Sequence, residues 1–303
     1  MQKSTLGQSD LQVSKYGLGC MSLGTDESTA FPILEAALEE GINYFDTADL
    51  YDQGRNEQLL GRFFKNNRED VIIATKVGNK WKDGESGWSW DASKAYIKEQ
   101  VKTSLKRLET DYIDLYQLHG GTLEDPIDET IEAFEELKEE GIIRYYGISS
   151  IRPNVIREYV KRSSIVSVMM QYSILDRRPE EEALPLLAEN GISVVTRGPV
   201  AKGLLSPKYV EKLTDKGYLD YSLEELRAVL TQLEKKFADT RTLTEAAIQY
   251  NLSQPGVASI IAGASNVEQL RSNAKAVKSA PLTENEISFI QKVSKASVYA
   301  AHR

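Results

Sequence analysis

Four side chains of this 303-residue sequence, Asp46, Tyr51, Lys76 and His119, form a chemically coherent set. A phenol gives up its proton reluctantly at neutral pH, and a neighbouring ammonium such as that of Lys76 stabilises the phenolate that remains. A carboxylate beside that ammonium keeps it charged, and an imidazole can orient a substrate oxygen or relay a proton. Such a set can exchange a proton with a carbonyl or alcohol oxygen, and a hydride carrier is its natural partner.

Each of the four residues also has a simpler structural interpretation. Lys76 could extend its ammonium to water from a strand end, and His119 could be a hydrogen-bonded structural histidine. Asp46 could cap the loop that follows it, and Tyr51 is one of 15 tyrosines. A different chemistry is open as well, in which Lys76 forms a Schiff base in an aldolase-like barrel. Proton transfer is favoured because four suitable groups stand near the ends of successive predicted strands.

The elements that must position these residues follow an alternating pattern of short apolar runs and helical segments, which is typical of a parallel sheet. Eight βα units fit a closed (β/α)₈ barrel better than a doubly wound sheet, so we predict one barrel domain over residues 1–303. Gly41, Gly141 and Gly191 follow three of the helices, where a residue with positive φ is wanted. The predicted strands are 16–19, 43–46, 71–76, 113–119, 144–149, 167–171, 193–197 and 259–262, and the predicted helices are 28–40, 56–64, 92–108, 127–140, 153–161, 179–190 and 267–277.

Three further segments lie outside the eight units. Residues 3–13 contain turn residues between two short strand-like runs, so we expect an N-terminal β-hairpin that plugs the bottom of the barrel. We also predict an added amphipathic helix within residues 218–238 and a C-terminal helix over residues 283–296. Thr283 and Glu286 have the spacing of a capping box at the start of that helix.

Composition excludes several classes of function. The formal charge of −8 argues against nucleic-acid binding, and the single cysteine and two histidines exclude a disulfide framework or a metal centre rich in those residues. Neither a signal peptide nor a membrane span is evident, so we expect a cytoplasmic protein. Active sites of such barrels lie at the carboxyl ends of the strands. The polar residues at those ends are Asp46, Lys76, His119, Ser149, Gln171 and Arg197.

Ordered motifs along nearly the whole chain resemble the aldo-keto reductase superfamily, most closely its bacterial general-reductase branch, near the potassium-channel β-subunit and tas-like members. The motifs are GLGCMSLG (17–24), GINYFDTADLYDQGRNEQLLG (41–61), IIATKVG (72–78), SLKRLETDYIDLYQLHG (104–120), IRYYGISS (143–150), MMQYSIL (169–175), GPVAKGLLS (198–206) and IIAGASNVEQLRSNAKAV (260–277). The resemblance implies a (β/α)₈ barrel that reduces a small-molecule carbonyl with NADPH. It leaves monomer and small homo-oligomer equally open.

The resemblance also implies residue roles. Tyr51 matches the general acid, Lys76 and Asp46 match the partners that stabilise its phenolate, and His119 matches the histidine that orients the carbonyl oxygen. Trp81 belongs to a mouth loop, 81–90, that could form an apolar substrate wall. The cofactor contacts expected from the resemblance, together with those expected from strand ends and the helix start (Cys20, Met21 and Arg271), are Cys20, Met21, Asp46, Ser149, Ser150, Gln171, Arg197, Gly198, Pro199, Val200, Lys202, Gly203, Leu205, Gly263, Ala264, Ser265, Gln269, Arg271 and Asn273.

Two positions depart from the family pattern. Ser150 replaces the usual asparagine, and Arg197 stands where many members stack a tyrosine on the nicotinamide; a guanidinium can stack by its planar face. Residues 263–266 end a predicted strand and open a helix, which suits phosphate, and Arg271 and Lys275 could add charge there or form an ordinary solvated basic face. Residues 17–22 only approximate a dinucleotide-binding glycine motif. The channel relatives leave a second function open, a cofactor-sensing subunit with slow chemistry.

Overall fold

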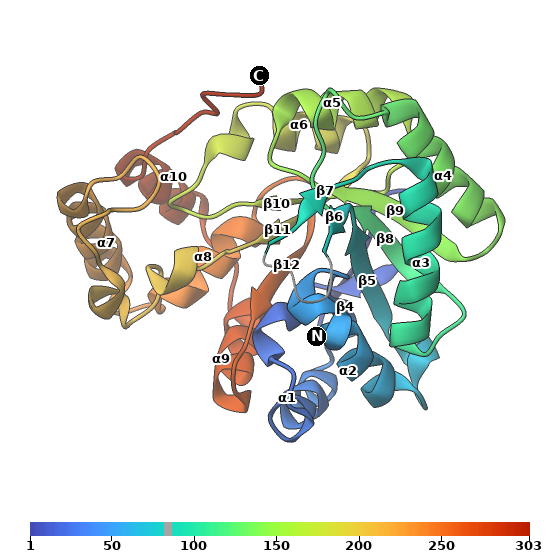
Figure 1. Cartoon of the computed structure of the whole chain (residues 1–303). Coiled ribbons are helices and arrows are strands. Elements are labelled where there is room, and N and C mark those ends of the chain that lie inside the picture. Colours follow the sequence, from blue (N-terminus) through green and yellow to red (C-terminus); the bar gives the residue numbers. More distant parts are fainter. Residues whose placement is uncertain (82–86) are drawn as a thin grey trace.

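The computed structural model, which describes residues 1–81 and 87–303, is a closed barrel of eight parallel strands surrounded by helices (Figure 1). The barrel strands are β3 (Tyr16–Gly19), β4 (Tyr44–Asp46), β5 (Ile72–Val77), β8 (Ile113–Leu118), β9 (Ile143–Ser149), β10 (Ser167–Gln171), β11 (Ser193–Arg197) and β12 (Val257–Gly263). Each strand pairs with the next one in this order, and β12 pairs with β3 to close the barrel. The predicted (β/α)₈ fold is confirmed.

The helices follow the strands along the chain. They are α1 (Glu27–Glu39), α2 (Arg55–Phe64), α3 (Lys94–Leu108), α4 (Ile127–Glu139), α5 (Pro153–Arg162), α6 (Ala183–Glu189), α7 (Leu223–Phe237), α8 (Leu243–Leu252), α9 (Val267–Lys278) and α10 (Glu284–Val293). Gly41, Gly141 and Gly191 follow α1, α4 and α6 with φ of 78°, 73° and 65°. These left-handed residues end the helices as their positions in the sequence predict.

The N-terminal hairpin closes the lower end of the barrel. Strands β1 (Lys3–Thr5) and β2 (Gln12–Ser14) pair antiparallel, and the apolar side chains of Leu6 and Leu11 between them are buried. Gly7 at the turn has a φ of 55°, and its N–H donates to the Ser193 hydroxyl at 2.7 Å. A Cβ on Gly7 would lie only 2.1 Å from the Val166 carbonyl oxygen, so the close contact requires glycine. The opposite, carboxyl end of the barrel remains for the site.

Two helical segments differ from the prediction. A single helix was predicted over residues 179–190, but the chain forms a 3₁₀ turn, Arg178–Glu180, and then α6. Pro185 lacks the N–H that would bond the Glu181 carbonyl in a continuous helix. Helix α8 was not predicted, although it is the segment that leads into β12. Seven of its ten residues are buried, so the sequence shows no single apolar stripe of helical period.

The two added helices lie near the predicted positions. Helix α7 begins after Ser222, within the predicted 218–238, and α10 begins after Thr283, with capping boxes at both starts. Helix α7 packs against both α8 and α10 at one side of the barrel (Figure 1). The structure also contains a short hairpin at the barrel mouth, β6 (Asn79–Lys80) with β7 (Ser89–Trp90), where only a loop was expected.

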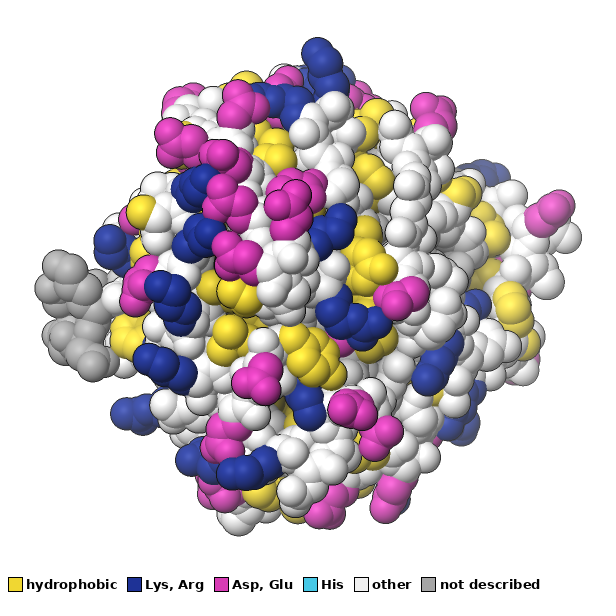
Figure 2. Space-filling view, turned by 90° about the vertical axis from the view of Figure 1, so that its right-hand side faces the viewer, with side chains coloured by type: hydrophobic (Ala, Val, Ile, Leu, Met, Phe, Trp, Pro, Cys, Tyr) yellow, Lys and Arg dark blue, Asp and Glu magenta, His cyan; other side chains and the backbone are white. Residues whose placement is uncertain are grey.

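The outer face over α3 and α4 carries interspersed basic and acidic side chains (Figure 2). Lys94 contacts Glu136 at 2.6 Å, and Lys98 contacts Glu136 and Glu140 at 2.7 and 2.9 Å. Such partly exposed pairs contribute little stability each. Within the described residues, no helix is both long and apolar enough to cross a bilayer.

Candidate active site

Asp46, Tyr51, Lys76 and His119 come together at the carboxyl end of the barrel. Lys76 projects from β5 and is 1% exposed; its ammonium lies 2.8 Å from the Asp46 carboxylate at the end of β4. The same nitrogen donates to the Thr47 carbonyl at 2.6 Å and to the Tyr51 hydroxyl at 3.3 Å. The structure therefore brings all four predicted residues into one site.

The electrostatics of the cluster keep Lys76 protonated. Burial alone lowers the pKa of Lys76, but the Asp46 carboxylate and the Tyr51 phenol outweigh this effect and raise the pKa above its ordinary value. An ammonium whose hydrogens point to three oxygens is not a free amine nucleophile. The Schiff-base alternative is therefore disfavoured.

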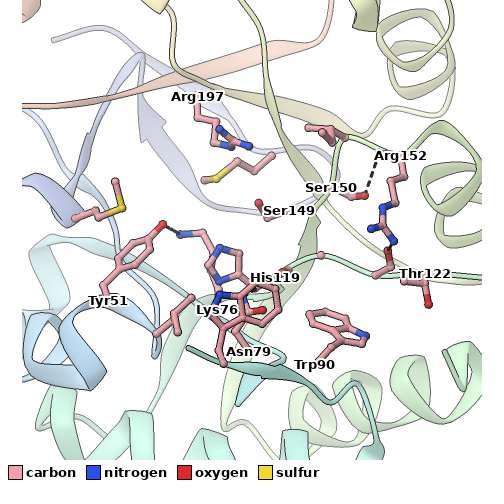
Figure 3. Close-up of a pocket in the computed structure, with 17 residues that line it drawn as sticks. Tyr51, Lys76, Asn79, Trp90, His119, Thr122, Ser149, Ser150, Arg152 and Arg197 are labelled. Carbon is pink, nitrogen blue, oxygen red and sulfur yellow. Dashed lines mark hydrogen bonds between the residues drawn. The ribbon is translucent and has the colours of Figure 1, made fainter. Parts of the chain in front are cut away.

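A strained turn places Tyr51. Tyr51 begins the 3₁₀ segment Tyr51–Gly54, in which Asp52 and Gln53 have φ of 49° and 55°. Residues other than glycine rarely adopt such positive values. The phenol points toward the Lys76 ammonium and the pocket (Figure 3). The turn thus directs a half-buried tyrosine from a loop onto a lysine held in the barrel wall.

His119 follows β8 as a neutral imidazole. Burial, together with the positive charges of Lys76 and Arg197, lowers its pKa to about 3. Its ring stands edge-on to that of Tyr51, with centroids 6.0 Å apart, and its Nδ1 is buried with no partner among the described residues. A neutral imidazole beside a phenol can donate a hydrogen bond to a substrate oxygen without carrying charge.

A cavity of about 630 Å³ opens between these residues (Figure 3). Residues predicted for the site that line it are Met21, Tyr51, Lys76, His119, Ser149, Ser150 and Arg197. Trp81 is absent from this lining; its indole N–H donates to the Asp49 carbonyl at 3.2 Å, and Arg107 lies over its ring. Trp88 and Trp90 of the same mouth segment supply the aromatic wall instead.

Sequence reasoning missed several other residues of the lining, among them Asn79, Thr122 and Arg152. Each lies two or three residues beyond a predicted site residue: Asn79 after Lys76, Thr122 after His119, and Arg152 after Ser150. That spacing was the available signal, because loops after the strands form the active-site face of a barrel.

Ser149, Gln171 and Arg197 end three neighbouring strands on the other side of the cavity. Gln171 pairs in register with Arg197, and the guanidinium donates to the Gln171 side-chain oxygen at 3.2 Å. Ser150 is buried, and its hydroxyl accepts the Arg152 backbone N–H at 3.2 Å. These groups could hold a planar amide with both donors and acceptors.

Cys20 and Met21 begin the turn after β3 but face different surroundings. The Cys20 thiol is buried, and burial raises its pKa well above the ordinary value, so it is no reactive thiolate. Met21 is 65% exposed and reaches the cavity rim. Only Met21 offers its side chain to a ligand there.

The segment after β11 forms a tight turn. Ala201 and Lys202 have φ of 47° and 57°; Ala201 is buried and Lys202 is exposed. Gly203 and Leu205 both donate their backbone N–H to the Val200 carbonyl, and Gly198 accepts from Ala201. Pro199 is buried beneath the turn. The turn therefore exposes a single cationic side chain, Lys202, which could meet a pyrophosphate.

The start of α9 offers a second anion-binding position. Asn266 caps the helix, and the Ser265 N–H and hydroxyl both donate to Gln269 Oε1. The Ala264 N–H donates to the Ser22 hydroxyl. A Cβ on the preceding Gly263 would lie 2.6 Å from that hydroxyl. The polar groups at this helix start suit a phosphate.

The two other predicted residues of α9 are engaged with protein atoms. The buried Asn273 amide donates to the Tyr16 hydroxyl and to the Gly263 carbonyl, so it supports the strand end rather than facing solvent. The Arg271 guanidinium lies 2.9 Å from the Glu39 carboxylate in an exposed pair. Such a pair is weak enough to rearrange around a phosphate.

Comparison with known proteins agrees with this architecture. The model of the Aldo/keto reductase family matches residues 15–295. The uncharacterized oxidoreductase YqkF of Bacillus subtilis is 62% identical over the full length of both chains. The NADH-specific methylglyoxal reductase of Escherichia coli is 33% identical over 91% of this chain and 94% of its own.

A solved structure extends the agreement to the fold. The aldo-keto reductase AKR11C1 of Bacillus halodurans, in its holo form, superposes with a TM-score of 0.95 at 61% identity, covering 100% of this chain and 99% of that one. With a family match over most of the chain and a relative of this identity, the protein belongs to the aldo/keto reductase family.

Proposed function

We propose that the protein is an NADPH-dependent reductase that converts aldehydes and ketones to alcohols, with Tyr51 as the general acid. The observation that carries this proposal is the 3.3 Å contact between the Lys76 ammonium and the Tyr51 hydroxyl at the wall of an open cavity. The ammonium stabilises a phenolate, so the phenol can release its proton to a substrate oxygen.

The residues around the cavity fit a nicotinamide dinucleotide. Ser149 and Gln171 would bind the carboxamide, and Arg197 would lie against the nicotinamide ring. Lys202 would contact the pyrophosphate, and the start of α9 with Arg271 would receive the 2′-phosphate. The exposed Arg197 and Lys202 side chains and the capped helix start support this assignment. Bound NADPH would supply a hydride to the carbonyl carbon.

The protein's own residues would then orient and protonate the carbonyl oxygen of the substrate. The neutral His119 imidazole donates a hydrogen bond that holds the carbonyl oxygen near Tyr51. Tyr51 transfers its hydroxyl proton to that oxygen, and the Lys76 ammonium stabilises the phenolate that is left. Asp46 keeps the ammonium in place, and solvent returns the proton to Tyr51 after the alcohol leaves.

The function is tested with purified protein, NADPH and a reactive carbonyl such as 4-nitrobenzaldehyde or methylglyoxal, followed at the nicotinamide absorbance. We expect steady turnover; no oxidation of NADPH with any aldehyde of a panel would contradict the proposal. Titration of tryptophan fluorescence with NADPH and with NADH tests the cofactor, and we expect about tenfold tighter binding of NADPH. Equal binding would contradict the NADPH preference, and tighter NADH binding would give this chain the preference named for the Escherichia coli relative.

A further inference from the structure

Two guanidinium groups, those of Arg152 and Arg197, face the active-site cavity. Among the residues that the structure describes, the lining includes Lys76, Arg152 and Arg197 but no aspartate or glutamate. Lys76 is balanced by Asp46 at 2.8 Å. The hydrogen bonds of the two arginine side chains go to uncharged oxygens, at 2.7 Å to the Gly121 carbonyl from Arg152 and at 3.2 Å to the Gln171 amide from Arg197. The described part of the lining therefore carries net positive charge.

A nearby carboxylate, that of Asp125, is already engaged. One of its oxygens accepts the Trp90 indole N–H at 2.8 Å and the Thr122 hydroxyl at 3.0 Å. The other accepts the Thr122 backbone N–H at 2.7 Å. These bonds fix the Trp90 wall, and within the described residues Asp125 forms no ion pair with Arg152, whose guanidinium can therefore pair with a ligand.

Arg152 is held in position but retains free donors. Its backbone N–H donates to the Ser150 hydroxyl, and one guanidinium nitrogen donates to the Gly121 carbonyl. A guanidinium has five N–H donors in a planar fork that matches a carboxylate. The half-buried side chain is thus pre-oriented, and its other N–H donors have no hydrogen-bond partner within residues 1–81 and 87–303.

The two arginines lie in different parts of the cavity. Arg197 stands beside Ser149 and is hydrogen-bonded to Gln171, on the side assigned to the nicotinamide. Arg152 lies across the cavity from Tyr51, with Trp90 between them along the lower wall (Figure 3). A substrate whose carbonyl oxygen is at Tyr51 would therefore extend along an aromatic surface toward Arg152.

We propose that the preferred substrates are aldehydes or ketones that carry a carboxylate, separated from the carbonyl by a short apolar or aromatic spacer, and that Arg152 binds this carboxylate. The inference rests on the proposed carbonyl reduction and specifies its substrate class. Arg152 is a specificity residue; it takes no part in proton transfer.

The test compares two aldehydes that differ in one charge, 4-formylbenzoate and its methyl ester, under NADPH-saturating conditions. In the wild type, kcat/KM for 4-formylbenzoate exceeds that for the ester by about tenfold or more, the effect expected of a hydrogen-bonded charge pair. Arg152→Gln lowers this ratio by about tenfold to a hundredfold, mainly through KM of the acid. Arg152→Lys keeps the charge but loses the planar fork, so its ratio lies between the two.

Arg157→Gln is the matched control, because Arg157 lies on α5, the helix that Arg152 directly precedes, and pairs with Glu182 outside the cavity; its ratio stays at the wild-type value. A wild-type ratio near one, with both aldehydes reduced, overturns this inference alone and requires no variant. A weakened NADPH affinity in Arg152→Gln with an unchanged ratio also overturns it, because Arg152 would then serve the cofactor. If the protein reduces neither of these aldehydes and no carbonyl of the panel, the proposed function is overturned as well.

Discussion

The Lys76 ammonium donates a hydrogen bond to the Tyr51 hydroxyl at 3.3 Å, although the two residues come from a barrel strand and a loop. Asp46 lies on the other side of the ammonium at 2.8 Å. This arrangement places a buried positive charge directly behind the phenol that faces the cavity. The properties of the site follow from the location of that charge.

Replacing Lys76 by methionine removes the charge with little change in volume. We expect kcat to fall by about 10²- to 10⁴-fold, because the Tyr51 phenolate loses its stabilising partner. The free energy of unfolding falls by about 3–5 kcal/mol, since Asp46 is left buried and unpaired.

The double variant K76M/D46N separates the two effects of Lys76. It recovers much of the lost stability, measured by denaturant unfolding, but none of the lost kcat. Lys80→Met, an exposed lysine outside the cluster, is the control and changes neither quantity appreciably. Near-normal kcat in K76M would contradict the role given to Lys76.

His119 should stay neutral at every pH at which the enzyme works. Its folded pKa of about 3 lies below the ordinary value of a histidine, so the unfolded chain binds more protons between these values and stability falls as the pH drops through that window. Replacing His119 by glutamine should flatten this acid loss, measured as the melting temperature against pH.

NMR titration provides a direct measurement of the same histidine. Removing the other histidine with His302→Ala leaves one imidazole signal, and we expect that signal not to titrate between pH 5 and 8. A midpoint near 6.5 would show that His119 carries a proton under working conditions, contrary to its proposed role as a neutral donor.

Gly78 lets the Trp90 ring pack closely against the backbone at the lower wall of the cavity. Its φ is 123°, and a Cβ there would lie 2.6 Å from the Trp90 ring. Gly78→Ala should therefore displace the aromatic wall and raise KM for aromatic aldehydes several-fold. Gly141→Ala is the control, because Gly141 also has positive φ (73°) but no atom within 4 Å of the added Cβ, so it costs stability without changing KM.

Asp49 is buried behind the site, and neither of its carboxylate oxygens has a hydrogen-bond partner among the described residues. Burial, reinforced by Glu57 and only partly offset by Arg107, raises the pKa of Asp49 well above its usual range. The unfolded chain therefore releases this proton more readily, and stability is lost as the pH rises above about 4.

Asp49→Asn removes this loss of folding stability at high pH. The variant should be more stable than the wild type at pH 8, by about 1–3 kcal/mol, and the difference should shrink toward pH 4. Asp215→Asn on the surface is the control and shows no such trend. Reduced stability of Asp49→Asn at pH 8 would mean that the carboxylate is ionised and favourably placed.

The positions of Asp46, Lys76 and His119 were predictable because strand order and strand direction determine which ends of the strands meet. Asp46 and Lys76 stand at or near the ends of neighbouring strands, so a parallel barrel must bring them together. Helix α8 was not predictable in this way, since Leu243 and its neighbours are buried on several sides and leave no stripe.

The rest of the cavity depends on loop paths that local patterns do not encode. Trp81 and Trp90 belong to one mouth segment, yet only Trp90 lines the cavity, because its indole is held by Asp125 while that of Trp81 turns toward Asp49. Arg152 comes two residues after Ser150 in the sequence. Its position at the cavity wall depends on the Gly121 carbonyl, which is 31 residues away along the chain. Such contacts between separate loops form only in the folded barrel.

The role of Tyr51 as general acid is tested most directly by the turnover of Tyr51→Phe with NADPH and 4-nitrobenzaldehyde, alongside its affinity for NADPH. Phenylalanine keeps the ring and removes only the hydroxyl that contacts Lys76. We predict that kcat falls by about 10²- to 10⁴-fold while NADPH binds as in the wild type. Full turnover by Tyr51→Phe would contradict the account, because another group would then have to protonate the carbonyl oxygen.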